Sequence, residues 1–526
     1  MDLNDLCITL VLVNCLWLLT LRPGWAWSIK ALAMLALLGG TWWWNPAQAG
    51  WIALGPFLVL MALPLWLQQA THRALYQRRF RAVWVMTSIL AILHPDARVK
   101  QMRRMSRVLP LFFRGQISEG LARAQQSGIE DMWLRNLAAV LNAQMSGQWE
   151  TFDAAFPGHG WADPNILVGK LQAAAERGDG TAFVQICEVI AQSDFTAERS
   201  AVLYLRAFAI LGEVDTVWKI LLGHSSLIAR ETREFWLAVA ERVSGQNRSA
   251  EDRWQRLRVS ASETLRPMVE RWWLQPSVAQ IPLEARSRAS AALKETRTVI
   301  DHDHCYAVLT THSRRWPIMT YALGLALLAV FLVEIPGGSE DVGNLVRLGA
   351  LRVPLTGEPG EWERMLTCGF LHVGPIHLGI NLLGLWFLGV RVERTWGALA
   401  MLLQFLICLL VSSSLLPWLT FLNLGEPAVF AGASGGIMGL LGGLWGHLAV
   451  GRFRRGTPLV RHQFWAVCVF ILMQSLCDLL TPEVSMTAHL VGLGTGAMLG
   501  VLMGLWSARL GGRGSCREHD SGAGAA

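Results

Sequence analysis

The sequence predicts an all-α polytopic membrane protein, in which three membrane spans and a cytoplasmic domain of repeated helices precede a core of six further spans. Hydrophobic residues make up 52% of the 526 residues, and charged residues only 16%, whereas a soluble protein usually carries about 25%. Several apolar runs approach the roughly 20 residues that cross a bilayer as a helix. The chain also holds 25 Trp against 4 Tyr, and many of these Trp flank the apolar runs, as interface anchors do.

The apolar runs fall into two groups separated by a long polar segment. The first group lies at about 4–22, 27–45 and 48–68. The second group lies at about 316–335, 376–390, 397–418, 432–450, 463–480 and 485–506. We therefore divide the chain into an N-terminal region of three transmembrane helices (1–70), a helical domain (71–313), a six-span core (314–508) and a disordered tail (509–526).

Positive charges predict the orientation of these spans, because Lys and Arg concentrate in cytoplasmic loops. Cations cluster in alternate connections, at Arg22, Lys30, His72, Arg73, Arg78, Arg79, Arg81, Arg314, Arg315, Arg391, Arg394, Arg452, Arg454, Arg455, Arg509 and Arg513. One topology satisfies every connection. It places the N-terminus outside, and both residues 71–313 and the C-terminal tail in the cytoplasm.

The 71–313 segment has a helical pattern in which glycine recurs at a nearly constant interval. The glycines are Gly115, Gly147, Gly178, Gly212 and Gly245. A period near 34 with helix–turn–helix units resembles a tetratricopeptide array, which stacks its units and leaves a concave binding surface. The alternative is a non-repeating helical domain whose glycines end helices. The segment shows no catalytic constellation in either case, so we expect it to bind a protein partner or to regulate the core.

Four polar residues stand out because such residues are costly inside a membrane and usually functional. Ser434 lies in AGASGGIMG, His489 in TAHLVGLGTG, and His377 and Asn381 in HVGPIHLGIN. Each lies a few residues inside the outer boundary of its span in the predicted topology. At a rise of about 1.5 Å per residue, all four occupy nearly one depth.

The chemistry of these residues suits hydrolysis of a peptide bond. A serine hydroxyl needs an adjacent base, usually histidine, and the oxyanion needs preorganised donors. His377 and Asn381 are four residues apart and share one helix face. Gly492 and Gly496 follow His489 on one stripe, a spacing that lets two membrane helices pack closely.

Residues 364–508 resemble the core of the rhomboid intramembrane proteases, and the resemblance extends to the 316–335 span. The matching motifs are HxxxN at 377–381, GASG at 432–435 and AHxxGxxxG at 488–496. His372 and ExxxG at 393–397 also fit the family pattern, in which His372, Glu393 and Gly432 support the site.

The resemblance implies an intramembrane serine endopeptidase that cuts transmembrane segments near the outer leaflet. Ser434 and His489 would form a dyad without an acidic third member. His377, Asn381 and the Ser434 amide would hold the oxyanion, while Arg364 would order the outer loop. The family implies a multi-pass protein of the cell membrane, such as a bacterial inner membrane, that works on membrane-protein substrates without a cofactor.

The sequence departs from the family pattern at two places. Glu363 precedes Arg364 where many members have Trp, and Trp362 lies one place earlier. Met438 stands four residues after the serine, where many members have an aromatic residue.

Other functions fit less well. An α/β-hydrolase elbow needs a strand–turn–helix context, whereas the serine motif of this chain opens a long apolar helix. A metalloprotease needs HExxH, which is absent. An aspartyl protease needs two intramembrane carboxylates, and Asp478 is the only Asp in the core spans. His302, His304 and Cys305 lack the further ligands of a zinc site. We expect no metal and no nucleic-acid partner. The main alternative is a catalytically inactive rhomboid-like adaptor or chaperone that binds transmembrane helices. A transporter would favour broken helices in two symmetric halves, and the sequence has no such symmetry.

Overall fold

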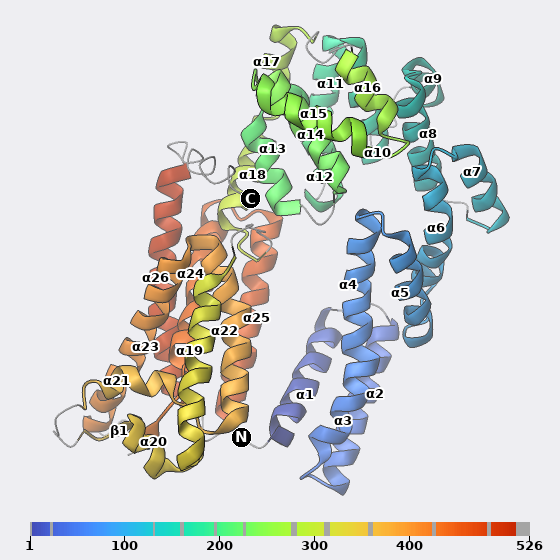
Figure 1. Ribbon diagram of the computed structural model, residues 1–526. Coiled ribbons are helices and arrows are strands. Elements are labelled where there is room, and N and C mark those ends of the chain that lie inside the picture. The colour runs from blue at the N-terminus through green and yellow to red at the C-terminus, as the bar shows by residue number, and fades with distance from the viewer. Residues whose placement is uncertain are drawn as a thin grey trace. The chain divides into compact units, whose positions relative to one another are not determined.

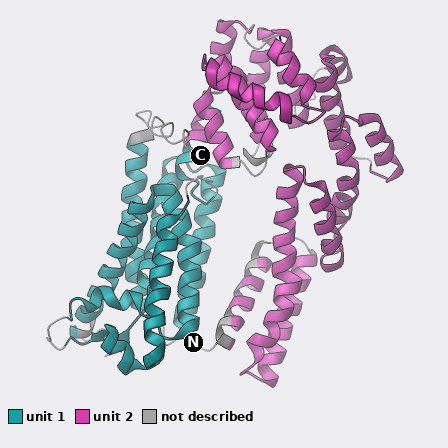
Figure 2. Ribbon diagram, viewed as in Figure 1, with its two compact units in different colours: residues 1–3, 302–526 teal, residues 4–301 magenta. Residues whose placement is uncertain are grey.

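The computed structural model describes residues 3–21, 25–129, 132–157, 163–193, 197–224, 228–274, 281–309, 316–355, 361–422, 428–480 and 485–511. These residues are almost entirely helical, and two three-residue strands form a small sheet (Figure 1). The chain divides into two compact units, one of residues 4–301 and one of residues 302–526 with the first three residues (Figure 2). Most of the predicted 509–526 tail lies outside the described residues.

The first unit begins with a group of apolar helices. These are α1 (Leu3–Leu21), α2 (Trp25–Trp44), α3 (Ala49–Phe57), the π-helix η1 (Leu58–Ala62), α4 (Leu63–Tyr76) and α5 (Phe80–Leu93). Segments α3, η1 and α4 form one continuous helix, in which Pro56 and Pro64 flank the π-helical part. Proline has no N–H for the i→i−4 ladder, so each of these prolines removes one backbone hydrogen bond from this helix. The apolar α5 falls in the segment that the sequence assigned to the cytoplasmic domain.

Five helical hairpins follow, each turning at one of the periodic glycines. The hairpins are α6 (Ala97–Phe113) with α7 (Ile117–Gln126), α8 (Met132–Ser146) with α9 (Trp149–Ala155), α10 (Pro164–Arg177) with α11 (Gly180–Gln192), α12 (Ala197–Leu211) with α13 (Val214–His224), and α14 (Arg230–Val243) with α15 (Asn247–Ser260). All five glycines have φ between +69° and +90°, a region that glycine enters without strain. At Gly178 and Gly212, the next residue donates its N–H to a carbonyl five residues earlier, which is the Schellman C-cap. The hairpin pattern agrees with the repeat interval, and the tetratricopeptide assignment stays a prediction.

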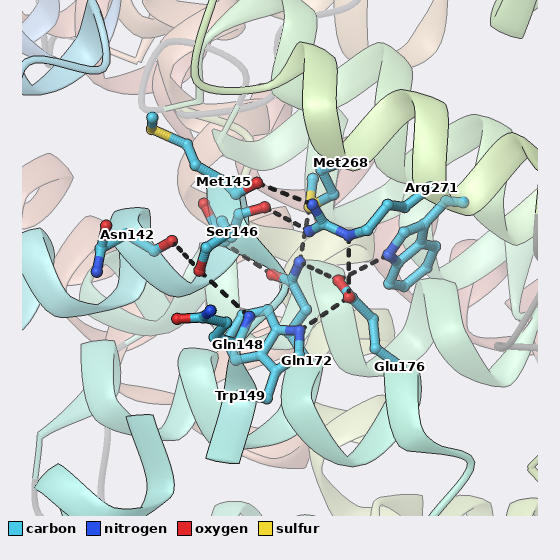
Figure 3. Close-up of polar contacts among 11 residues, drawn as sticks. Asn142, Met145, Ser146, Gln148, Trp149, Gln172, Glu176, Met268 and Arg271 are labelled. Atoms are coloured by element: carbon cyan, nitrogen blue, oxygen red, sulfur yellow. Dashed lines mark hydrogen bonds and ion pairs between the residues drawn. The ribbon is translucent and has the colours of Figure 1, made fainter. Parts of the chain in front are cut away.

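The hairpins stack through their first helices, since α8, α10, α12 and α14 contact one another in succession. Helices α16 (Arg266–Leu274), α17 (Leu283–Ala292) and α18 (Lys294–Tyr306) follow. A buried polar cluster joins the stack to α16 (Figure 3). The Glu176 carboxylate accepts from the indoles of Trp149 and Trp272, both at 2.8 Å, and from Gln172 at 3.0 Å. Arg271 lies 3.5 Å from Glu176 and donates to the Met145 carbonyl. Most donors and acceptors in this interior cluster are therefore paired, as buried polar groups require.

The second unit contains the remaining elements. They are α19 (Ile318–Glu334), η4 (Ile335–Gly337), α20 (Val342–Leu348), β1 (Leu351–Val353), α21 (Arg364–Thr367), η5 (Cys368–Phe370), α22 (Gly374–Trp396), α23 (Ala398–Phe421), β2 (Ala428–Phe430), α24 (Ser434–Arg454), α25 (Pro458–Leu480) and α26 (Met486–Gly511). Among the described residues, six helices are long and apolar enough to cross a membrane, at Ala49–Tyr76, Ile318–Gly337, Gly374–Trp396, Ala398–Trp418, Pro458–Leu479 and Met486–Arg509. The three other predicted spans correspond to α1, α2 and α24, which are helical over 19, 20 and 21 residues. The predicted fold class, an all-α polytopic membrane protein, is confirmed.

Helix α24 forms the centre of this unit. It contacts α22, α23, α25 and α26, and its residues from Gly435 to Gly451 are almost all buried. Its packing against α26 is backbone to backbone. A Cβ added at Gly492, Gly496 or Gly500 would overlap the carbonyl oxygen of Gly435, Gly439 or Gly443, respectively. Small residues allow this approach of two membrane helices, and it fixes the level of α24 against α26.

Candidate active site

Ser434 is the first residue of α24, and a short strand leads into it. Strand β2 pairs antiparallel with β1, and the Gly432 N–H donates to the Cys368 carbonyl at 2.8 Å. The first backbone bond of the helix runs from Ile437 N to Ala433 O. The N–H groups of residues 434–436 therefore precede the intrahelical ladder, at the helix end that carries a partial positive charge.

His489 lies in the first turn of α26, at the same level as Ser434. A Cβ on Gly435 would lie 3.8 Å from the Ala488 carbonyl oxygen, and one on Gly492 would overlap Gly435 O. These contacts involve the immediate neighbours of Ser434 and His489. Within the described residues no hydrogen bond joins the two side chains themselves. Catalytic hydrogen bonds are often long in unliganded sites and tighten in the substrate complex.

His377 and Asn381 lie one turn apart near the start of α22, and Gly432 links His377 to Ser434. A Cβ on Gly432 would lie 2.8 Å from His377 Cε1 and 3.8 Å from Ser434 Oγ. Asn381 is buried and donates one amide hydrogen to the His377 carbonyl at 3.0 Å. Its amide carries a second hydrogen. The structure thus brings His377 up to Ser434 and holds Asn381 on the same face of α22.

His372 supports His377 from the preceding loop. The two rings meet edge-on, with centroids 5.3 Å apart. The His372 backbone N–H donates to the buried Glu334 carboxylate at 3.1 Å. Burial, together with the neighbouring His377, lowers the pKa of the His372 imidazole to about 3, so this ring is neutral at pH 7.

The other residues that the family pattern selected make contacts around the candidate site. Arg364 donates to the carbonyls of Val346 and Ala350 at 2.6 and 2.9 Å, and so joins α21 to the segment around α20. Glu393 caps the start of α19, since it accepts from the N–H groups of Met319 and Thr320 at 2.9 and 2.7 Å. Gly492 and Gly496 lie in the α24–α26 contact.

The structure shows the surroundings of both departures from the family pattern, at Met438 and at Trp362–Glu363. Met438 is buried in the hydrophobic core of the second unit. Trp362, before Glu363 and Arg364, is 72% exposed, so it does not anchor the loop through burial. The hydrogen bonds of Arg364 to α20 are present without it.

Asp478, which belongs to no recognised sequence motif, lies against His489 in the structure. The Asp478 Oδ2 and His489 Nδ1 atoms are 2.8 Å apart, and both side chains are buried. The only signal in the sequence was the carboxylate itself, because an ionisable residue in a span is costly. Its partner was not visible, since the two residues lie on different helices.

The histidine-rich HDHC segment at residues 302–305 packs against α24 through two hydrogen bonds. His302 Nε2 lies 3.0 Å from the Gly451 carbonyl, and His447 Nε2 lies 2.9 Å from the Cys305 carbonyl. Among the residues that the structure describes, no group of three or more His, Cys, Asp or Glu side chains is arranged to hold a metal ion.

Comparisons with known proteins find one kind of domain. The model of the Rhomboid domain matches residues 359–506. Rhomboid protease GluP of Bacillus subtilis (strain 168) is 41% identical over 129 residues, which are 24% of this chain and 24% of that protein. RHOMBOID-like protein 4 of Arabidopsis thaliana is 31% identical over 160 residues, or 30% of this chain and 39% of that protein. Rhomboid protease GlpG of Pectobacterium atrosepticum is 26% identical over 201 residues, or 38% of this chain and 67% of that protein.

The match to the first two relatives thus covers less than half of their lengths. No solved structure matches the chain significantly. The matched region contains His372, His377, Asn381, Ser434 and His489. Residues 359–506 of this multi-pass membrane protein are therefore a Rhomboid domain.

Proposed function

We propose that this chain is an intramembrane serine endopeptidase in which Ser434 is the nucleophile and His489 its base. The observation that carries the proposal is the backbone contact of Gly435 with Ala488 and Gly492, which brings the N-terminal turns of α24 and α26 together. The match of residues 359–506 to the Rhomboid domain supports it, as does the similarity of the chain to named rhomboid proteases.

The arrangement suits acyl transfer in two steps. His489 takes the Ser434 hydroxyl proton as Oγ attacks the substrate carbonyl, and then gives it to the leaving amine. The negative charge on the carbonyl oxygen develops at the α24 N-terminus, where the Ser434 N–H, His377 and the second amide hydrogen of Asn381 are the candidate donors. Water then releases the acyl group from Ser434 by the same route.

The substrate class follows from the position of the site near the ends of three apolar helices. A substrate helix hides its carbonyls in backbone hydrogen bonds, so small or helix-breaking residues must open it before cleavage. We propose that membrane proteins are cut near the outer end of their spans, in the cell membrane, and that the helical hairpins of residues 97–260 bind a protein partner in the cytoplasm.

The orientation can be mapped with reporter fusions. Fusions within residues 75–310 are expected to report a cytoplasmic location, because cations flank this segment on both sides. A reporter fused after Gly338, between α19 and α22, is the matched control and should report the outside. An outside signal within 75–310 would overturn the topology and the outer-leaflet cleavage site with it.

The protease activity is tested with the purified full chain in detergent and a single-span model substrate. The parent should cleave the substrate within its span, and Ser434→Ala should abolish cleavage because the nucleophile is gone. Membranes of cells that carry either form should differ in cleaved fragments. Equal cleavage by Ser434→Ala would refute the serine mechanism, and absence of cleavage by both forms would favour the adaptor alternative.

A further inference from the structure

The proposed base, His489, has a carboxylate within hydrogen-bonding distance. A Ser-His dyad has no such third member. Asp478 lies near the end of α25 and His489 in the first turn of α26, eleven residues later, with Oδ2 and Nδ1 2.8 Å apart. We propose that Asp478 is a positioning residue that holds His489 with Nδ1 protonated and Nε2 free to accept the Ser434 proton. This inference rests on the proposed function.

Asp478 is buried, and both of its carboxylate oxygens have hydrogen-bonding partners. The residue is 5% exposed, and His489 is 7% exposed. Its second oxygen, Oδ1, accepts a hydrogen bond from Gln474 one turn earlier on α25 at 2.9 Å. Each carboxylate oxygen therefore has one hydrogen-bonding partner. A buried charge without such partners would be strongly unfavourable.

The chemistry of the pair selects one histidine tautomer. An ionised carboxylate only accepts hydrogen bonds, so the ring nitrogen that faces Asp478 must carry the proton. A neutral imidazole then presents a lone pair at Nε2, which is the form that a general base requires. When Nε2 takes the Ser434 proton, the ring becomes an imidazolium, and the adjacent negative charge stabilises it. Asp478 keeps its charge throughout and exchanges no proton.

A purely structural tie between α25 and α26 is the competing explanation, and the isosteric Asp478→Asn variant separates the two. The introduced amide can still hydrogen-bond His489, so a tie between the helices would survive. It has no negative charge, and its NH₂ group can donate to Nδ1 and so favour the tautomer with the proton on Nε2. Charge and tautomer therefore change while shape and hydrogen-bonding capacity remain.

The kinetic test uses the full chain in detergent with the single-span substrate. For Asp478→Asn, kcat should fall by up to about 10⁴-fold, which is the loss seen when the aspartate of a Ser-His-Asp site is replaced by its amide. The KM and the thermal transition should stay unchanged. Asp478→Glu should recover part of the kcat because it restores the carboxylate. Cys477→Ala, one residue away on α25, is the matched control and should behave as the parent.

Two outcomes would overturn the inference. One is a parental kcat in Asp478→Asn. The other is a loss of kcat that tracks a lowered thermal transition in both Asp478→Asn and Asp478→Glu. Either result would leave the protease proposal intact, provided that the parent cleaves and Ser434→Ala does not.

A second measurement does not depend on activity. In ¹⁵N-histidine-labelled Ser434→Ala protein, the His489 signal, assigned by its loss in Ser434→Ala/His489→Gln, should report protonated Nδ1 and unprotonated Nε2. Adding Asp478→Asn should change that tautomer. If the signal shows the Nε2-protonated tautomer, or does not respond to Asp478→Asn, Asp478 does not position the ring. If the parent fails to cleave, the protease proposal fails while this result still stands.

Discussion

Replacing His489 by alanine should lower cleavage of a single-span substrate by about 10⁴-fold or more, nearly as much as loss of the nucleophile itself. The Ser434 hydroxyl would then have no base to take its proton. The measurement is kcat/KM of the purified chain in detergent. A serine-directed fluorophosphonate should label Ser434 in the parent and lose that label in His489→Ala.

When residues act as one catalytic unit, replacing one of them removes most of the activity, and replacing a second adds little further loss. The Ser434→Ala/His489→Ala double variant should therefore be no slower than either single variant. His462→Ala removes an exposed histidine at the start of α25 and is the control, with parental activity expected. Cleavage by His489→Ala at the parental rate would remove His489 from the mechanism and leave its pairing with Asp478 without a catalytic role.

The spans and the positions of the polar residues within them could be predicted because both depend on order along one helix. The 376–390 and 485–506 runs correspond to α22 and α26, and His377 and His489 lie in their first turns. The predicted start of the serine-bearing span, residue 432, is two residues before the observed start of α24. Their spacing in the sequence predicted close helix packing at Gly492 and Gly496, and each of these glycines faces a backbone carbonyl of α24.

Features that depend on contacts between distant segments could not be predicted. The pairing of β1 with β2 involves three residues on each strand, too few for an alternating pattern to be visible. The bond between Asp478 and His489 joins two helices, and nothing in their spacing identifies which faces meet. Glu393 matched the family pattern, but its capping of α19 appears only when two spans are side by side.

In the helical domain, too, local features could be predicted from the sequence, and contacts between distant segments could not. A glycine at positive φ must end a helix, so the interval from Gly178 to Gly212 predicted where hairpins turn, and the structure places a turn at each. The buried Glu176 cluster was not visible, because it joins α16 to helices about a hundred residues earlier. The partner of this domain stays a prediction.

The contact that aligns Ser434 with His489 can be tested with two glycines on one helix. Gly496→Ala should lower the thermal transition of the detergent-solubilised chain and reduce cleavage. A Cβ at this position would overlap the Gly439 carbonyl oxygen, and backbone cannot move aside as a flexible side chain can. Overpacking of this kind typically costs about 1–3 kcal/mol, and forcing α26 away from α24 would also separate the base from the nucleophile.

Gly494 is the matched control, because it lies two residues away on α26 and a Cβ there would meet nothing within 4 Å. Gly494→Ala should keep parental activity and should not lower the thermal transition, since alanine favours helix over glycine. The two variants share helix, depth and chemical change, so a difference between them isolates the interhelical contact. If both behave as the parent, α24 and α26 are not in backbone contact at Gly496, and the alignment of Ser434 with His489 needs another explanation.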